Sequence, residues 1–182
     1  MSVDSSDDTA TYPACRVIAR TVVIGGQTKV ELVERLARSG VEINESGKIL
    51  FASDRFITSH VPTQLTTVEL SVRDLGFPRG ATLSEVYASA WRVGLRSCPL
   101  ELGPHLRLQF LDQPEGFVGQ PVWKHRAPPG SLTIASEVLS DDDEFPKGFY
   151  LRRIQGTPWL RGYRCGPEHV WDPDDRMLFA EP

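Results

Sequence analysis

The stretch that most constrains the fold runs from Thr82 to Phe110, where two hydrophobic periods follow one another. Thr82 and Glu85 have the spacing of a capping box, which marks the start of a helix. Behind this box, apolar side chains recur at helical spacing and predict one buried stripe: Leu83, Val86, Tyr87, Ala90, Trp91 and Leu95. From residue 104 to residue 110, apolar and polar side chains alternate, and this period of two predicts a strand.

The first half of the chain predicts a strand, a capped helix, a short helix and a second strand. Residues 16–24 are rich in β-branched side chains, which favour a strand. A second capping box, Thr28 with Glu31, predicts a helix over about 29–39 that ends at Gly40. Its expected buried face and the two leucines beside it are Val30, Val33, Ala37, Leu32 and Leu36.

Further signals complete the order of elements. Asn44 is a good N-cap for a short helix ending near residue 51. In the strand predicted at 67–72, Val68, Leu70 and Val72 point inward. The second half adds an irregular, proline-containing piece over 118–130 and four strands, the middle two forming a hairpin. The four are residues 131–138, 148–154, 159–164 and 176–181.

This order predicts an α+β fold with two main helices, a mostly antiparallel sheet and a C-terminal β-meander. The length of 182 residues fits one domain. We expect that domain to span residues 15–182, with possible lobes at 15–80 and 81–182. Residues 1–14 are polar and acidic, and we expect them to form a disordered tail.

Cysteine use and hydropathy indicate a cytoplasmic protein with no membrane partner. Cys15, Cys98 and Cys165 form no close pair, which is typical of a reducing compartment. The N-terminus has no basic region leading into an apolar run, and no apolar run reaches the ~18 residues of a membrane span.

The balance of charge disfavours nucleic acid as a partner. The net charge is −4, and without the three tail carboxylates Asp4, Asp7 and Asp8 it is −1. A nearly neutral body lacks the overall basic footprint of a nucleic-acid binder, although a local basic patch stays open.

Common catalytic motifs are absent from the sequence. There is no phosphate-binding GxxxxGK[ST] loop, and the GxGxxG, GxSxG and HExxH patterns are also missing. Cys165 and His169 have a spacing that could supply two metal ligands, but a zinc site needs two more and no partner pair is visible. We therefore predict neither a metal site nor a cofactor.

The best polar constellation by periodicity lies on the strand predicted at 104–110. His105, Arg107 and Gln109 would share one face and could supply a proton shuttle, an anion clamp and an amide donor. Glu101 lies just upstream and could join them or pair with Arg107. The alternative is an ordinary solvated sheet face, which also requires polar residues at period two.

The predicted hairpin offers a second surface. Trp159, Arg161 and Tyr163 would share one face of their strand, and Tyr150, Arg152 and Ile154 one face of the other. Aromatic and guanidinium groups would then alternate across the sheet, which suits base stacking or an acidic partner. The alternative is that Trp159 and Tyr163 belong to the core, with Arg161 extending to its edge.

Four blocks of sequence resemble a widespread bacterial family of uncharacterised proteins: LSVRDLGFPRGAT, CPLELGPHLRLQFLDQPEG, FPKGFYLRRIQGTPWLRGYRC and HVWDPDDRMLF. The similarity extends from about Arg16 to Phe179. Members are sometimes labelled helicase, but a helicase needs a nucleotide-binding loop, which this chain lacks. The resemblance implies a bacterial cytosolic single-domain protein and transfers no catalytic residues.

Three functions remain open from the sequence. The leading hypothesis is a non-enzymatic binding or interaction module for a protein or a small polar ligand. The second is a small enzyme that uses His105 as acid or base and Arg107 as an anion clamp. The third is single-stranded nucleic-acid binding through the hairpin at 149–164.

Overall fold

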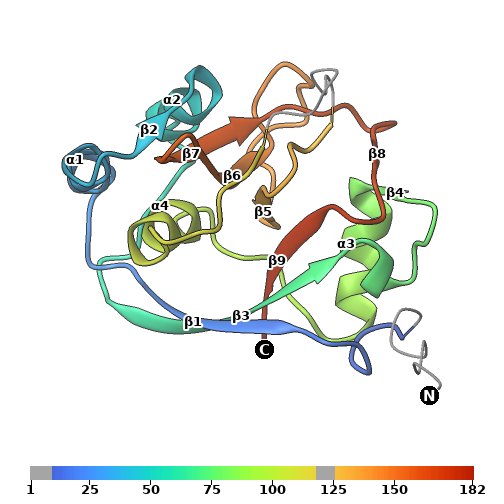
Figure 1. Cartoon of the computed structure of the whole chain (residues 1–182). Helices are drawn as coiled ribbons and strands as arrows, with labels where there is room; N and C mark the ends of the chain where they lie inside the picture. The colour runs from blue at the N-terminus through green and yellow to red at the C-terminus, as the bar shows by residue number, and fades with distance from the viewer. Residues whose placement is uncertain (1–9, 118–125) are drawn as a thin grey trace.

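A computed structural model describes residues 10–117 and 126–182 of the chain (Figure 1). These residues form one α+β fold with four α-helices and a short 3-10 helix: α1 (Lys29–Arg38), α2 (Glu45–Ala52), η1 (Arg73–Leu75), α3 (Leu83–Arg92) and α4 (Leu102–Gln109). Its strands are β1 (Ile18–Ile24), β2 (Glu42–Ile43), β3 (Thr63–Ser71), β4 (Ala81–Thr82), β5 (Leu132–Ile134), β6 (Gly148–Ile154), β7 (Thr157–Tyr163), β8 (Val170–Trp171) and β9 (Arg176–Ala180). Most of the irregular piece predicted at 118–130, namely 118–125, lies outside the described residues.

Seven strands form one mixed, mostly antiparallel sheet in the order β1-β3-β9-β5-β6-β7-β2. β4 and β8 form a separate two-stranded sheet. The predicted C-terminal meander is only partly present, because the last strand does not follow the hairpin at the edge. Instead β9 pairs antiparallel with β3 and parallel with β5, so it joins the strands of the first half to those of the second.

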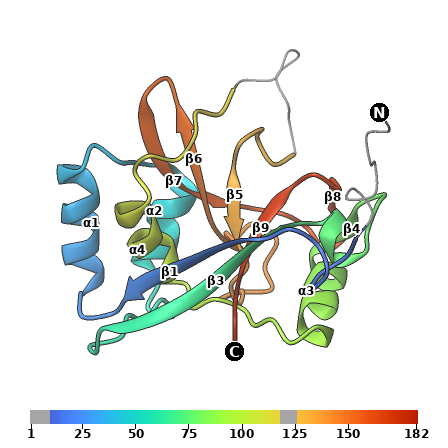
Figure 2. The same ribbon diagram turned by 60° about the horizontal axis from the view of Figure 1, so that its bottom comes forward.

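One face of the large sheet carries the first core. α1, α2 and α4 lie on this side (Figures 1 and 2). Leu36 of α1, Leu50 of α2 and Leu106 of α4 pack there with Phe149 and Leu160 of the hairpin, all of them buried. This core draws on residues from both halves of the chain, so it does not follow the possible lobe boundary at residue 80.

The opposite face is covered over only part of its width. α3 and the β4–β8 pair lie over β3 and β9, where Val86, Ala90 and Trp171 pack against Leu70 and Phe179 in a second core. The inner hairpin strands β6 and β7 lie beyond α3 (Figure 2). That part of the face contains the cavity described below.

Local capping signals predicted the starts of α1, α2 and α3 correctly. Thr28 with Glu31 and Thr82 with Glu85 form complete capping boxes, and the Asn44 side chain accepts the N–H of Gly47 at the start of α2. Each box satisfies two backbone groups that a helix start leaves unpaired. These contacts involve residues only three positions apart, so the sequence contains everything needed to predict them.

The buried faces of α1 and α3 differ from the predicted ones. α1 buries Leu32 and Leu36, whereas Val30 is 67% exposed. α3 buries Val86 and Ala90 as expected. Trp91 is 52% exposed, so its assignment to the core is wrong. In α1 the predicted face of Val30, Val33 and Ala37 is exposed, and in α3 Trp91 lies at helical spacing but on the exposed flank.

The strand predicted at 104–110 is wrong, because residues 104–109 belong to α4. Leu102 and Leu106, four positions apart, are both buried in the first core. Burial of this pair requires the helical period, and the alternating pattern therefore does not determine the secondary structure here. Pro104 is the third residue of α4, where the missing N–H has no intrahelical partner to lose. Gly103 lets the helix approach the sheet, since a Cβ there would lie 2.7 Å from a ring carbon of Phe149.

The strand predicted at 131–138 is shorter than expected. It covers Leu132–Ile134, and beyond it Ser136 makes an isolated bridge with Cys98. The other three strands of the second half lie where the pattern placed them.

The N-terminal part of the described chain is anchored to the body. The N–H of Tyr12 donates to the carbonyl of Asp74 at 2.7 Å, and the Tyr12 ring packs against the second core. The ordered body therefore begins before residue 15, while residues 1–9 of the predicted tail lie outside the described residues. Within the described ranges, no helix is both long and apolar enough to cross a membrane.

Candidate functional site

The predicted hairpin forms from β6 and β7, and its register places the candidate side chains together. Arg152 lies opposite Trp159, and Tyr150 lies opposite Arg161. The turn between the strands is Gln155–Gly156, and both residues have positive φ, as a tight hairpin turn requires. Because side chains alternate along a strand, these four residues share one face of the sheet. It is the face that α3 leaves uncovered.

A cavity of about 300 Å³ opens on this face, and we call it the hairpin pocket. Its walls come from the chain before β5, from β5 itself, from the hairpin and from β8. The lining residues are Arg126, Ala127, Pro128, Thr133, Tyr150, Arg152, Arg161, Gly162, Tyr163, Arg164 and Trp171. Arg152, Arg161 and Tyr163 were candidates from the sequence, and the structure brings these three into one cavity.

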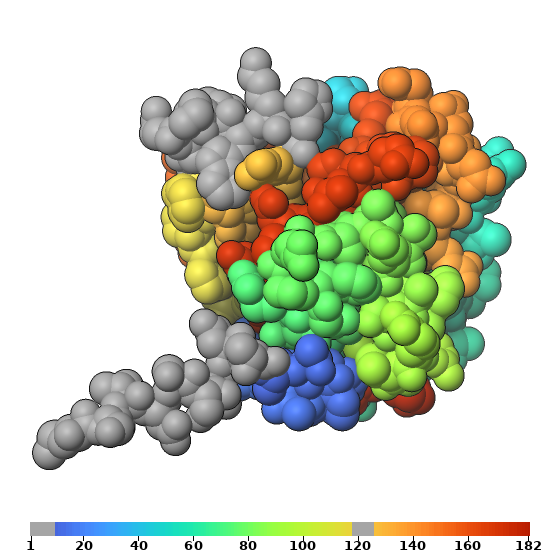
Figure 3. All heavy atoms as spheres, turned by 90° about the vertical axis from the view of Figure 1, so that its right-hand side faces the viewer, coloured from blue at the N-terminus to red at the C-terminus, as the bar shows by residue number. Residues whose placement is uncertain are grey.

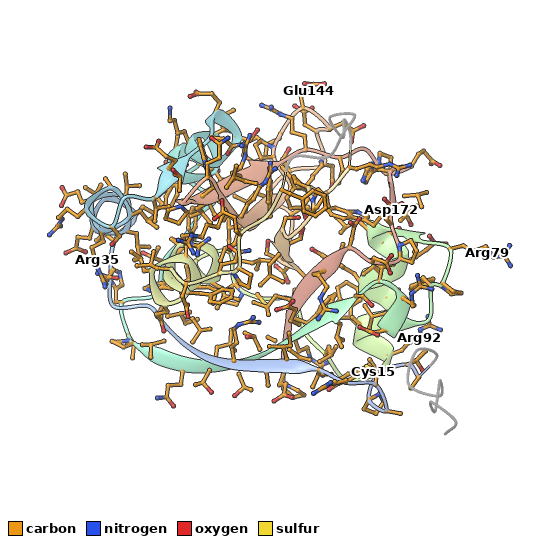
Figure 4. All side chains as sticks on the ribbon, viewed as in Figure 1. Cys15, Arg35, Arg79, Arg92, Glu144 and Asp172 are labelled. Atoms are coloured by element: carbon orange, nitrogen blue, oxygen red, sulfur yellow. The ribbon has the colours of Figure 1, made fainter. Side chains whose placement is uncertain are left out.

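Four guanidinium groups line the pocket, but they differ in what they bind. Arg126 lies 3.4 Å from a carboxylate oxygen of Asp172, which Figure 4 labels on the chain between β8 and β9. Arg164 donates to the carbonyl of Glu144 and to the Ser46 hydroxyl. Among the described residues, neither Arg152 nor Arg161 forms an ion pair with a carboxylate. Two positive charges in the pocket are therefore left without a counterion from this part of the chain.

Unpartnered donors accompany these charges. The Nε atoms of Arg152 and Arg161 and the Nε1 atom of Trp171 are buried and have no hydrogen-bond partner among the described residues. Leaving a buried donor unpaired costs roughly 1–3 kcal/mol, and more when the group is charged. A ligand that supplies acceptor atoms would remove this cost.

The ionisable groups of the pocket influence one another. Burial lowers the pKa of Arg152, and the like charge of Arg161 lowers it further, while Tyr150 acts in the opposite direction. Burial raises the pKa of Tyr150, although Arg161 and Arg152 both act to lower it. Tyr150 therefore keeps its proton near neutral pH and presents a hydroxyl donor beside two cations.

The aromatic candidates occupy different positions around the pocket. The guanidinium carbon of Arg161 lies 5.0 Å from the centre of a Trp159 ring, within cation–π range. Trp159 itself is not a lining residue, so it orients Arg161 from the side. Tyr163 packs at right angles to Trp171 with 5.5 Å between ring centres, and it contacts the second core. Tyr163 thus forms part of the pocket wall and of the core at once.

The polar row predicted around His105 is not on a sheet face, because α4 carries it into the body. His105 is 4% exposed, and its Nε2 atom accepts the N–H of Gly25 at 3.0 Å. Burial lowers the pKa of His105 to about 4, with a smaller contribution from Arg35. Glu101, one turn earlier, accepts the Ser59 N–H, and burial raises the pKa of its carboxyl group. His105 and Glu101 thereby fasten two loops to α4, and both groups are occupied by these contacts.

Gln109 has a related role at the edge of the sheet. Its amide oxygen accepts the N–H of Val23 at 3.0 Å, and its amide nitrogen donates to the carbonyl of Val23 at 2.7 Å. Val23 lies on β1, an outer strand of the sheet. One side-chain amide thus satisfies both backbone groups that an edge residue leaves unpaired.

Arg107 of α4 contacts the backbone of the hairpin from the face of the sheet opposite the hairpin pocket. It is fully buried and donates to the side chain of Gln113 at 2.7 Å and to the carbonyl of Phe110. The same guanidinium reaches the carbonyls of Arg152 and Trp159 at 3.5 and 3.4 Å. Because those two residues face each other across the hairpin, Arg107 supports the strands that position the pocket.

Several pocket residues escaped selection from the sequence. Tyr150 was predicted to share a face with Arg152 but was not chosen as a site residue, although the alternation along the strand would have justified choosing it. Thr133, Arg126 and Trp171 carry no such signal, because they reach the pocket from three separate segments. Their proximity depends on how β5 and β8 are placed by the sheet and by α3.

Within the described ranges, no three His, Cys, Asp or Glu side chains are placed to hold a metal ion. Comparison of the chain with protein-family models, curated proteins and solved structures found no match. The resemblance to a bacterial family therefore stays a prediction, and the hairpin pocket is the feature of the molecule that bears on function.

Proposed function

We propose that this protein is a binding module that captures a small anionic ligand in the hairpin pocket. The observation that carries the proposal is the pair Arg152 and Arg161. Both line the cavity, both have a buried Nε atom without an acceptor, and neither meets a carboxylate among the described residues. A ligand with negatively charged oxygens would supply the missing charge and the missing acceptors together.

The chemistry of the lining residues narrows the ligand class. A guanidinium group offers a planar set of donors that matches carboxylate and phosphate oxygens. Tyr150 and Thr133 add hydroxyl groups in the same cavity. A volume of about 300 Å³ lies at the small end of ligand pockets in proteins. These features favour a small metabolite with a carboxylate or phosphate group.

Single-stranded nucleic acid fits this site less well. Base stacking needs an exposed aromatic face, and Arg161 lies over one face of the Trp159 ring. The net charge of −4 also provides no long-range attraction for a polyanion. We therefore treat oligonucleotide binding as an outcome that the experiment must separate from small-ligand binding.

The proposal is tested by calorimetric titration of the full chain with inorganic phosphate, pyrophosphate, citrate and a short oligothymidylate. We expect at least one small anion to bind, and the variants R152Q and R161Q each to weaken its binding about tenfold or more. The matched control is R153Q. Arg153 is next in sequence but belongs to the opposite face of β6, where it pairs with Glu115 at 3.6 Å, so its replacement should leave the affinity unchanged.

Folding must be checked alongside binding. Arg152 and Arg161 are part-buried, so each variant is first compared with the parent by thermal unfolding and circular dichroism. A folded R152Q/R161Q double variant that binds the anions as tightly as the parent would contradict the proposal. Binding of the oligothymidylate alone, weakening steeply as salt rises, would replace it with the nucleic-acid function.

A further inference from the structure

A second cavity, of about 460 Å³, shares no lining residue with the hairpin pocket. We call it the α3 pocket, because one wall is the exposed flank of α3. Its lining residues are Leu83, Ser84, Tyr87, Trp91, Val138, Asp141, Asp143, Lys147, Cys165, Gly166 and Pro167. Figure 3 views the molecule from the side of α3 and shows this helix beside the segments that follow β5 and β7.

The helix wall is apolar and aromatic. Leu83, Tyr87 and Trp91 follow one another at intervals of four residues, so they form one row along α3. The ring centres of Tyr87 and Trp91 are 6.1 Å apart, and the rings are inclined by 57°. The hydroxyl of Tyr87 donates to the carbonyl of Ser136, which fixes its ring, while Trp91 stays half exposed. Two inclined aromatic rings therefore line one wall of an open cavity.

The facing wall adds negative charge. Asp141 and Asp143 belong to the loop between β5 and β6, and both line the pocket. Lys147 is the pocket's cation, but its ammonium group donates to the carbonyls of Ser140 and Asp142 and lies 4.0 Å from Asp143. Asp143 thus offsets Lys147, and Asp141 has no ion-pair partner within the described residues.

We propose that the α3 pocket binds an organic cation, an ammonium group carried on an apolar body. Aromatic rings attract a cation through the negative charge on their faces, and quaternary or methylated ammonium groups are bound in this way. The carboxylate of Asp141 supplies the complementary charge, and Leu83 and Val138 contact the apolar part of the ligand. The α3 pocket takes a ligand of the opposite charge to that of the hairpin pocket.

Charge favours an organic cation over two other possible occupants of the α3 pocket, which are the chain's own first residues and a small anion. The chain's own first residues carry Asp4, Asp7 and Asp8 and no lysine or arginine, so the acidic loop would repel them. A small anion would meet Asp141 and Asp143 directly. An uncharged ligand would gain from apolar contact with this wall but not from the electrostatic attraction of the carboxylates and the ring faces.

The test compares three molecules of nearly the same shape and different charge. They are choline, its uncharged carbon isostere neohexanol, and the carboxylate of tert-butylacetic acid. Binding to the full chain is measured from the chemical shifts of backbone and indole N–H groups. We expect choline to bind more tightly than neohexanol, and the carboxylate to bind least. The shifts that move should be those of α3 and of the loop containing Asp141.

Two variants and two controls locate the site. W91L keeps an apolar side chain but removes the ring, and it should weaken choline binding about tenfold. D141N should weaken it about threefold, because the charge is partly screened by solvent. The matched controls are F117L, an exposed ring elsewhere, and D54N, an exposed carboxylate elsewhere, and both should bind like the parent.

The outcome can contradict the proposal in two ways. Equal affinity for choline and neohexanol would show a merely apolar pocket. Unchanged choline affinity in W91L would show that the rings do not bind the cation. Trp91 is half exposed, so W91L is expected to stay folded, and a thermal melt of the variant checks this. If W91L nevertheless fails to fold, W91F is the second variant, and an affinity between those of the parent and D141N is expected.

Discussion

His105 accepts a hydrogen bond from the backbone N–H of Gly25 through its Nε2 atom at 3.0 Å, and so joins α4 to the turn after β1. This contact requires a neutral imidazole, because a protonated Nε2 has no lone pair to accept with. Burial accordingly lowers the pKa of His105 from 6.5 to about 4. The residue selected as a possible acid or base is thus held in one protonation state by the fold.

The first prediction is a loss of stability in acid that depends on His105. Between pH 6.5 and about 4, an unfolded His105 binds a proton and the folded one does not, so the free energy of unfolding falls as the pH falls. The effect should be on the order of 3 kcal/mol. H105Q retains an acceptor for Gly25 but cannot titrate, so urea unfolding across this range should show a smaller loss for the variant.

The carboxyl group of Asp175 titrates in the same pH window as His105, with the opposite effect on stability. Burial raises the pKa of Asp175 from 3.8 to about 6, so its contribution to stability is present at low pH and is lost as the pH rises towards 6. Asp175 is unchanged in H105Q, so its contribution cancels in the difference between the two proteins. Parallel pH profiles of parent and variant would contradict the assignment.

The second prediction concerns Arg107, which supports the hairpin from behind. R107M removes a buried guanidinium that serves the carbonyls of Phe110, Arg152 and Trp159. Buried acceptors would be left unpaired, and we expect a loss of about 2–4 kcal/mol in urea unfolding. R153Q breaks only a part-exposed ion pair and should cost less than about 1 kcal/mol. Equal stability of R107M and the parent would contradict this role.

The third prediction reverses the expectation from the helical pattern of α3. Trp91 was predicted to be core, yet it is half exposed, so W91A should lower the free energy of unfolding by less than about 1 kcal/mol. Leu95 belongs to the same predicted stripe and is buried, and L95A should cost about 2–5 kcal/mol. Chemical denaturation of the two variants checks the pair. A larger loss in W91A than in L95A would show that α3 is rotated relative to its position here.

The fourth prediction locates the N-terminal boundary of the body. Deleting residues 1–9 should leave the melting temperature unchanged, because this acidic segment has little to bury. Deleting residues 1–14 also removes Tyr12, which packs against the second core and bonds to Asp74, and it should cost about 1–3 kcal/mol. Thermal unfolding of both truncations tests this, and identical melts would place the boundary at residue 15 after all.

Local chemistry alone was enough to predict part of this structure. The capping boxes at Thr28 and Thr82 depend on contacts between residues only three positions apart. The shared face of the hairpin residues could also be predicted, since alternation along two paired strands places Arg152 and Arg161 on one side of the sheet. For these features the neighbouring residues supply the whole physical reason.

Tertiary structure alone decided the rest, because packing can choose between two periods that the sequence allows. Residues 104–110 alternate like a strand, but Leu102 and Leu106 fill the first core only as a helix, and Gly103 lets that helix approach Phe149. The same holds for the pocket, where Arg126, Thr133 and Trp171 meet the hairpin from separate segments. The sequence by itself determined the starts of α1, α2 and α3 and the hairpin face. Two tertiary features decided which of these side chains became core and which became a site. β9 is inserted between β3 and β5, and α3 covers only part of one face of the sheet.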